Sequence, residues 1–179
     1  MILIISTCKE HLSESEFVRP IAMLIEDHNI LHYSKIKPAD IKTADKIIIA
    51  GTALKDFDYL EGDFSWLKKC DKPVLGICSG MQVIAKEFGV PLEEHTIIGP
   101  QKVEVIAENK LAKDTFNAYF LHTKTGTGTF KTLATSNGKP CMIKHSEREI
   151  YGCIFHPEVM NEDIIRNFCN QHGIPKSHK

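Results

Sequence analysis

A cysteine between two glycines is the residue of this chain best suited to nucleophilic chemistry. The segment Gly76-Ile-Cys78-Ser-Gly80-Met-Gln82 lies between an expected buried strand and an expected helix. Small residues two positions before and after a nucleophile permit the tight strand-to-helix turn called a nucleophile elbow. Such a turn presents its side chain at the carboxyl end of the sheet, and the following helix N-terminus favours a thiolate. The pattern predicts a reactive thiol at Cys78, and the alternative is a packed cysteine beside glycines that only allow close contact.

A histidine and a glutamate follow another expected strand, in Phe155-His156-Pro157-Glu158. Proline biases the residue before it towards extended geometry. Because positions i and i+2 of an extended segment point to the same side, we expect His156 and Glu158 to share one face. A general base and the carboxylate that orients it need this arrangement. The alternative is a strand end that carries a solvated histidine and glutamate.

The elements that must position these residues predict an α/β fold. In the first half, apolar runs alternate with helical stretches, which is typical of a parallel sheet covered on both faces. We expect strands at 2–5, 30–33, 46–50 and 74–77, and helices at 14–28, around Trp66, and at 79–88. The second half predicts strands at 102–106, 118–121, 132–135, 141–144 and 150–155, joined by short turns such as Asn137-Gly138, and a last helix at 162–171. The expected architecture is three-layer αβα with a central mixed, largely parallel sheet, in a single domain over residues 1–179.

Composition and charge narrow the class of protein. The chain has 179 residues, of which 42% are hydrophobic and 25% charged, as in a soluble domain with a full core. Its 22 basic and 23 acidic residues give a net charge of −1, which offers no electrostatic footprint for nucleic acid or an anionic membrane. The apolar opening, Met1–Ser6, is too short for a signal peptide, and no apolar run approaches the ~20 residues of a membrane span. We therefore expect a cytoplasmic protein with no nucleic-acid or membrane partner.

The six cysteines and nine histidines form no metal-binding pattern. There is no CxxC pair, no HExxH and no Cys-His cluster at ligand spacing, so we expect no metal, no cofactor and reduced thiols. Cys8 follows the first expected strand and could line the same end of the sheet as Cys78, although a packed thiol is the favoured interpretation. Thr125-Gly-Thr-Gly-Thr129 is interpreted as a loop rather than a phosphate-binding site, because it carries no Gly-Lys-Thr.

Together the two motifs, about 75 residues apart, resemble the class I, triad-type glutamine amidotransferases. The similarity extends over nearly the whole chain, including the opening strand, the Lys72-Pro-Val-Leu-Gly approach to the cysteine and the closing helix with Ile165-Arg-Asn-Phe168. It is strongest to the glutaminase subunit of GMP synthetase, and the glutaminases of anthranilate synthase and imidazole glycerol phosphate synthase are nearly as similar.

The resemblance implies a catalytic triad. Cys78 would attack the side-chain amide of glutamine and form a γ-glutamyl thioester, with release of ammonia. His156 would act as general base and then general acid, and Glu158 would orient it. Gln82 matches a family residue that helps to hold the substrate, and the backbone N–H of Ser79 matches one oxyanion donor. No cofactor is implied.

Two segments depart from the family pattern. Many members have Ser-Gly-Gly-Pro after the third strand, where this chain has Ala50-Gly51-Thr52-Ala53, so Gly51 precedes a threonine at the place of the second oxyanion N–H. Thr52 is expected to resist a positive φ. Relatives have Ser-His at the strand end where main-chain groups hold the amino-acid end of glutamine, and this chain has Leu121 before His122 and Thr123.

The expected function is that of a glutaminase subunit which supplies ammonia to a separate synthetase such as GMP synthetase, because the amidotransferase part fills the single expected domain. One alternative is a stand-alone γ-glutamyl hydrolase or peptidase with a wider pocket, motivated by Thr52 and Leu121. The other is a catalytically degenerate protein that binds a partner or a glutamine-like ligand, although the complete set of Cys78, His156 and Glu158 argues against it.

Overall fold

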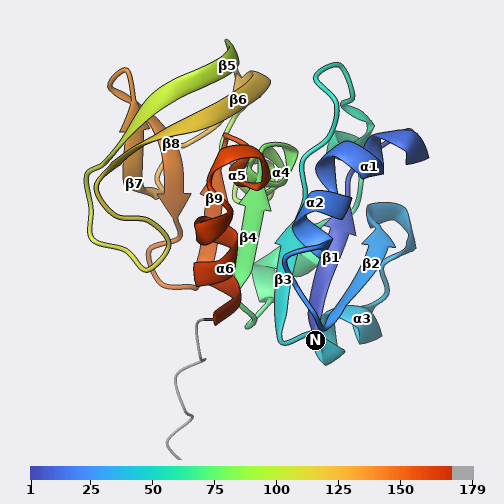
Figure 1. The fold of residues 1–179 in the computed structure, drawn as a ribbon. Helices are drawn as coiled ribbons and strands as arrows, with labels where there is room; N and C mark the ends of the chain where they lie inside the picture. The colour runs from blue at the N-terminus through green and yellow to red at the C-terminus, as the bar shows by residue number, and fades with distance from the viewer. Residues whose placement is uncertain (171–179) are drawn as a thin grey trace, which may run out of the picture.

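The computed structural model describes residues 1–170, and within them nine strands form one mixed sheet (Figure 1). The strand order is β2-β1-β3-β4-β9-β8-β7-β5-β6. The first five strands in that order pair in parallel and the other four are antiparallel additions, which confirms the predicted mixed sheet. Their bounds are β1 Ile2–Ser6, β2 His28–His32, β3 Lys46–Ile49, β4 Val74–Ile77, β5 Glu93–Val105, β6 Thr115–Thr125, β7 Lys131–Ser136, β8 Lys139–Lys144 and β9 Ile150–Cys153.

Two hydrophobic cores cover the two faces of this sheet. Alternate residues of a strand point to opposite faces, so Ile4 and Ile48 enter one core and Leu3 and Ile47 enter the other. The first core packs under α1 (Glu14–Phe17), α2 (Arg19–Ala22), α5 (Pro157–Met160) and α6 (Glu162–Asn170), which Figure 1 shows in front of the sheet. The second core lies under α3 (Pro38–Thr43), α4 (Ser79–Glu87) and the 3-10 segments Asp58–Glu61 and Ser65–Lys69. The predicted three layers are confirmed.

The helix expected at 14–28 is wrong in its extent. The structure has two four-residue helices instead, and β2 begins at His28 rather than at residue 30. Pro20 lacks the N–H that an unbroken helix would donate to the carbonyl of Glu16. The helical path therefore breaks at Val18, whose φ is −108°.

The long hairpin of β5 and β6 is the element whose length was most underestimated from the sequence. The expected strands 102–106 and 118–121 are only the parts next to the core of two strands of 13 and 11 residues. Gly99 and Pro100 resemble strand breakers, but here they pair only with Phe120 and Tyr119 of β6. Because this half of β5 has a neighbour on one side only, the missing N–H of proline is tolerated.

Smaller elements follow the expectations more closely. Asn137 and Gly138 both have positive φ, +50° and +74°, as a two-residue hairpin turn between β7 and β8 requires. The segment around Trp66 is a 3-10 helix rather than an α-helix, and α3 was not predicted. The last helix runs to Asn170, and residue 171 of the expected helix lies outside the described residues. None of the helices in residues 1–170 is both long and apolar enough to span a membrane.

Candidate active site

Cys78 occupies a strained turn between β4 and α4, with φ of 50° and ψ of −103°. Its N–H donates to the carbonyl of Cys153 on β9 at 2.8 Å, which ties the turn to the neighbouring strand. The flanking glycines make the turn possible. A Cβ on Gly76 would lie 2.5 Å from the carbonyl carbon of Gly80, and a Cβ on Gly80 would lie 2.2 Å from the carbonyl oxygen of Ile49. The geometry is the predicted nucleophile elbow.

His156 and Glu158 meet directly: Nδ1 of the imidazole lies 2.7 Å from Oε1 of the carboxylate, and both side chains are 1% exposed. The expected route to this contact is wrong. The helix α5 begins at Pro157, and His156 is the residue that precedes it, with φ of −105° and ψ of 89°. The two side chains are therefore brought together by a strand-to-helix turn and not by an extended segment. The backbone N–H of His156 donates to the carbonyl of Tyr119 at 2.8 Å and so fixes this turn on β6.

The charges around His156 favour its imidazolium form. Burial alone would lower the pKa of the imidazole, but the negative charge of Cys78 and the hydrogen bond and charge of Glu158 outweigh it. The pKa of His156 is consequently raised well above its ordinary value. A cysteine, an imidazole and a carboxylate at one site can perform nucleophilic attack and proton transfer.

Gly51 packs against these groups rather than against open space. A Cβ on this glycine would lie 2.7 Å from Cε1 of His156 and 3.4 Å from Cβ of Cys78. The next residue, Thr52, is buried and is absent from the residues with positive φ, so its branched side chain causes no backbone strain here. Its hydroxyl donates to Oδ2 of Asp56 at 2.8 Å.

Two buried hydroxyl groups lie at the start of α4. The Thr7 and Ser79 hydroxyls are each 3.0 Å from the carbonyl oxygen of Ala50, and they are 2.8 Å from each other. Each hydroxyl has one proton, so two of these three contacts are hydrogen bonds at any moment. They hold the ends of β1 and β3 against the elbow. Thr7 was missed from the sequence, because a single threonine after a strand carries no signal of its own.

Gln82, in the first turn of α4, lines a small cavity beside Cys78. Its Nε2 donates to the carbonyl of Lys124 at 2.8 Å, and its Oε1 accepts a hydrogen bond from the hydroxyl of Tyr59. Burial, and then the negative charges of Cys78 and Asp56, raise the pKa of that phenol, so the hydroxyl remains a donor. Gln82 therefore supports the cavity wall through both ends of its amide, and Tyr59 is a site residue that was missed from the sequence.

The cavity beside Cys78 is nearly closed. It has a free volume of about 10 Å³, which is about the space of one water molecule. The structure brings Thr52, Ser79, Gln82, His122 and Thr123 together around it, and Leu121 and residues 53–57 of the segment after β3 complete the lining. The full lining is Thr52, Ala53, Leu54, Asp56, Phe57, Tyr59, Cys78, Ser79, Gln82, Leu121, His122 and Thr123.

His122 is the least satisfied polar group of this cavity. The side chain is 2% exposed, and neither ring nitrogen has a hydrogen-bond partner in the described part of the chain. Burial, and then the charges of His95 and His156, lower the pKa of His122 to about 4. Near neutral pH the cavity is therefore lined by an uncharged imidazole that offers one donor and one acceptor.

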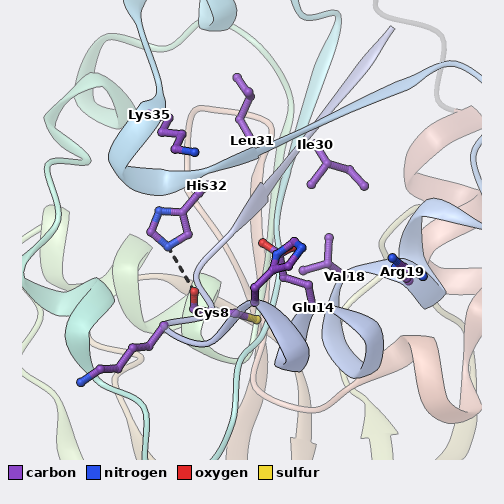
Figure 2. A pocket seen from close by; sticks show the side chains of 10 residues that line it. Cys8, Glu14, Val18, Arg19, Ile30, Leu31, His32 and Lys35 are labelled. Carbon is purple, nitrogen blue, oxygen red and sulfur yellow. Dashed lines mark hydrogen bonds and ion pairs between the residues drawn. The ribbon is translucent and has the colours of Figure 1, made fainter.

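Cys8 lies apart from this cavity, at a second pocket of about 690 Å³ (Figure 2). Its Sγ is 3.7 Å from the carbonyl oxygen of Gly51, and Nε2 of His32 donates to the Cys8 carbonyl at 3.1 Å, the dashed line of Figure 2. Burial is the largest cause of the raised pKa of the Cys8 thiol. The favoured interpretation of Cys8 as a packed thiol agrees with this environment. In residues 1–170, no group of three or more His, Cys, Asp or Glu side chains is placed to hold a metal ion.

A mixed sheet of this topology, with Cys78, His156 and Glu158 at the carboxyl edge of its parallel strands, defines the class of α/β protein. The chain belongs to the glutamine amidotransferase class-I family, whose model matches residues 20–171. It is 34% identical over 135 residues to a glutamine-hydrolyzing GMP synthase subunit of Pyrococcus furiosus, a match that covers 68% of this chain and 72% of that protein. It is 38% identical over 117 residues to the corresponding subunit of Methanococcus aeolicus, a match that covers 57% of this chain and 61% of that protein.

A solved structure extends the likeness to nearly the full length. A putative GMP synthase subunit from Thermoplasma acidophilum superposes with a TM-score of 0.78 at 25% identity, and the match covers 94% of this chain and 92% of that one. The fold is therefore shared over 94% of this chain, whereas the sequence alignment with the Methanococcus aeolicus relative spans about three fifths of that protein.

Proposed function

We propose that this protein is a glutaminase subunit that hydrolyses glutamine to glutamate and ammonia and delivers the ammonia to a separate synthetase, such as GMP synthetase. The single observation that carries the proposal is the Cys78, His156 and Glu158 arrangement at a nucleophile elbow. The family model and the names of the two relatives support it. Residues 1–179 would form one amidotransferase domain that acts in the cytoplasm.

Hydrolysis would take place in two halves. The Cys78 thiolate attacks the γ-carbonyl carbon of glutamine, and the oxyanion that forms is stabilised by the backbone N–H groups of Thr52 and Ser79. His156 gives a proton to the leaving nitrogen as the carbon–nitrogen bond breaks, which releases ammonia and leaves a γ-glutamyl thioester. His156 then takes a proton from water, the hydroxide attacks the thioester carbonyl, and glutamate leaves with return of the Cys78 thiolate. Glu158 holds the imidazole in the required tautomer in both halves.

The substrate-binding part of the proposal follows from the cavity lining. The side-chain amide of glutamine would enter beside Cys78, and the amino-acid end would lie at Leu121, His122 and Thr123, where main-chain groups of β6 are available. Gly51 would keep the triad free of a side chain, and Gln82 would hold the cavity wall.

Labelling with a glutamine-mimicking diazoketone tests this function without requiring turnover. The expected result is one adduct in the intact mass, lost in Cys78→Ala and prevented by excess glutamine. A second arm measures glutamine hydrolysis with and without a purified GMP synthetase subunit that lacks its own glutaminase, and we expect stimulation. A folded protein whose Cys78 reacts with neither the diazoketone nor glutamine, with the synthetase present, would exclude glutaminase function and favour a degenerate binding protein.

A further inference from the structure

Glutamine cannot reach Cys78 in the state that the structure describes. The cavity has space for about one water molecule, and Sγ of Cys78 lies 3.4 Å from the Leu121 carbonyl oxygen across it. A carboxamide and its methylene chain are larger than one water. Some part of the lining must therefore move before the proposed reaction begins.

The walls of the cavity differ in how firmly they are held. Cys78, Ser79 and Gln82 belong to the buried elbow and to α4, and Leu121 to Thr123 are part of β6 in the sheet. The segment from Gly51 to Phe57 belongs to no helix or strand. Of the amides in this segment, only that of Asp56 donates to a backbone carbonyl within the described residues, to Ala53 at 3.0 Å. The segment from Gly51 to Phe57 is therefore the part of the cavity wall that can open at the lowest cost in free energy.

One carboxylate fastens this segment. Oδ2 of Asp56 accepts the backbone N–H of Lys9 at 2.6 Å and the hydroxyl of Thr52 at 2.8 Å. Lys9 lies on the turn after β1, in a different part of the chain, so the first bond ties the cover to the body of the protein. Hydrogen bonds to a charged acceptor are about twice as strong as neutral ones.

A nearby ion pair contributes less than Asp56 to holding the segment in place. The Lys9 ammonium lies 3.1 Å from Asp58, but both side chains are about half exposed, at 55% and 54%. Exposed ion pairs contribute little because water screens them and the long side chain loses freedom. Asp56, and not Asp58, is therefore the main attachment of the segment to the Lys9 turn.

We propose that residues 52–57 are a gate over Cys78 and that Asp56 is the positioning residue that latches it shut through the Lys9 amide, while its bond to the Thr52 hydroxyl holds the gate segment together. The proposal rests on the proposed function, because it treats the closed cavity as the glutamine site. Breaking the latch exposes Cys78 to solutes.

The rate of Cys78 alkylation by iodoacetamide, mapped by peptide mass, tests the gate. Asp56→Leu keeps the branched shape and the number of heavy atoms of the side chain, so it removes the acceptors without enlarging the cavity by truncation. We expect Cys78 in this variant to react about tenfold faster than in the natural protein, since loss of the Lys9 hydrogen bond to a charged acceptor shifts the opening equilibrium by about that factor. Asp56→Asn, which keeps an acceptor without the charge, should give an intermediate rate.

Matched controls separate opening from loss of structure. Asp63→Leu removes another carboxylate that accepts a backbone N–H, that of Ser65 at 2.9 Å, outside the cavity, and should leave the rate unchanged. The alkylation rate of partly exposed Cys169 measures the activity of the reagent, and the alkylation rate of fully buried Cys153 measures global unfolding. A Cys78 rate in Asp56→Leu that is unchanged or slower, or that rises in parallel with that of Cys153, would overturn the proposal. Iodoacetamide needs no glutamine site. The gate proposal can therefore be contradicted while the diazoketone test supports the proposed function, and the proposed function can be contradicted while the gate proposal holds.

Discussion

The Cβ that Gly51 lacks would lie 2.7 Å from Cε1 of His156, closer than side-chain carbons approach each other in folded proteins. Gly51, just after β3, therefore lies directly against the imidazole ring. A residue proposed for substrate binding is thus a neighbour of the proposed general base.

Gly51→Ala should reduce kcat/KM for glutamine by at least about 100-fold, because an added methyl group must displace the imidazole and a misplacement of about 1 Å can cost that factor. The measurement is steady-state ammonia release, with thermal unfolding recorded beside it. Ala39→Ser, on the exposed part of α3 and outside the cavity lining, also adds one heavy atom and should retain the activity of the natural protein. A Gly51→Ala enzyme with normal kcat/KM would show that His156 has more room than the structure gives it.

Glu158→Gln should lower kcat by about 10²–10⁴-fold with a smaller change in KM, since the neutral amide no longer fixes the tautomer of His156 or supports its positive charge. Single-turnover formation of the thioester would measure this step. Glu162→Gln, on the exposed surface of α6, is the control and should behave as the natural protein. Equal activities of the two variants would remove Glu158 from the proposed triad.

His122 should make stability depend on pH in a defined window. Its pKa is about 4 in the folded protein, against an ordinary value of 6.5, so the unfolded chain binds more protons between these two values. Stability is therefore lost as pH falls from about 6.5 to about 4, and between pH 7 and pH 5 this residue alone should remove about 1–2 kcal/mol of the free energy of unfolding.

Urea unfolding of His122→Leu and the natural protein at both pH values isolates this contribution, because the other titrating groups are common to both. The variant should lose less stability on acidification. His11→Gln, at a side chain 90% exposed, should follow the natural protein. Identical losses in all three proteins would contradict a low pKa at His122.

The Thr7 and Ser79 hydroxyls should be coupled. Thr7→Val removes one donor but leaves the Ala50 carbonyl bonded to Ser79, so we expect a loss of about 1 kcal/mol in the free energy of unfolding. Ser79→Ala alone should cost a similar amount. The double variant leaves a buried carbonyl without a hydroxyl donor and should cost more than the sum of the two by about 1 kcal/mol. Simple additivity in denaturant titrations would show that the two hydroxyls act independently.

The parts of the site that the sequence could predict are those fixed by local geometry. Gly76 and Gly80 define the elbow because a Cβ on Gly76 would meet α4 and a Cβ on Gly80 would meet β3, and this constraint involves only a few neighbouring positions. The prediction of one helix over 14–28 was wrong because the spacing of apolar residues does not show where a proline interrupts the hydrogen bonds of a helix. The contact of His156 with Glu158 was predicted correctly from a wrong local conformation, since i and i+2 can also meet across the first turn of a helix.

Other features depend on the tertiary structure and leave no local trace. Thr7 contacts the site from the turn after β1, and Asp56 and Tyr59 contact it from the connection after β3; none of the three belongs to a local sequence motif. The near closure of the cavity follows from side chains of β6 and of the segment after β3, which are far apart in the sequence. No periodicity or spacing encodes such a contact, so it appears only when the sheet is assembled.

The position of β9 has a consequence for how the protein forms. This strand is inserted between β4 and β8, so the neighbour of the cysteine strand comes from the last fifth of the chain. Contacts between residues so distant in sequence form late, because the intervening chain must first be ordered. During synthesis on the ribosome, the thiol of Cys78 would therefore emerge long before its histidine. A nascent or prematurely terminated chain would carry the proposed nucleophile without its proposed base. The two groups would act together only after the last strand had docked.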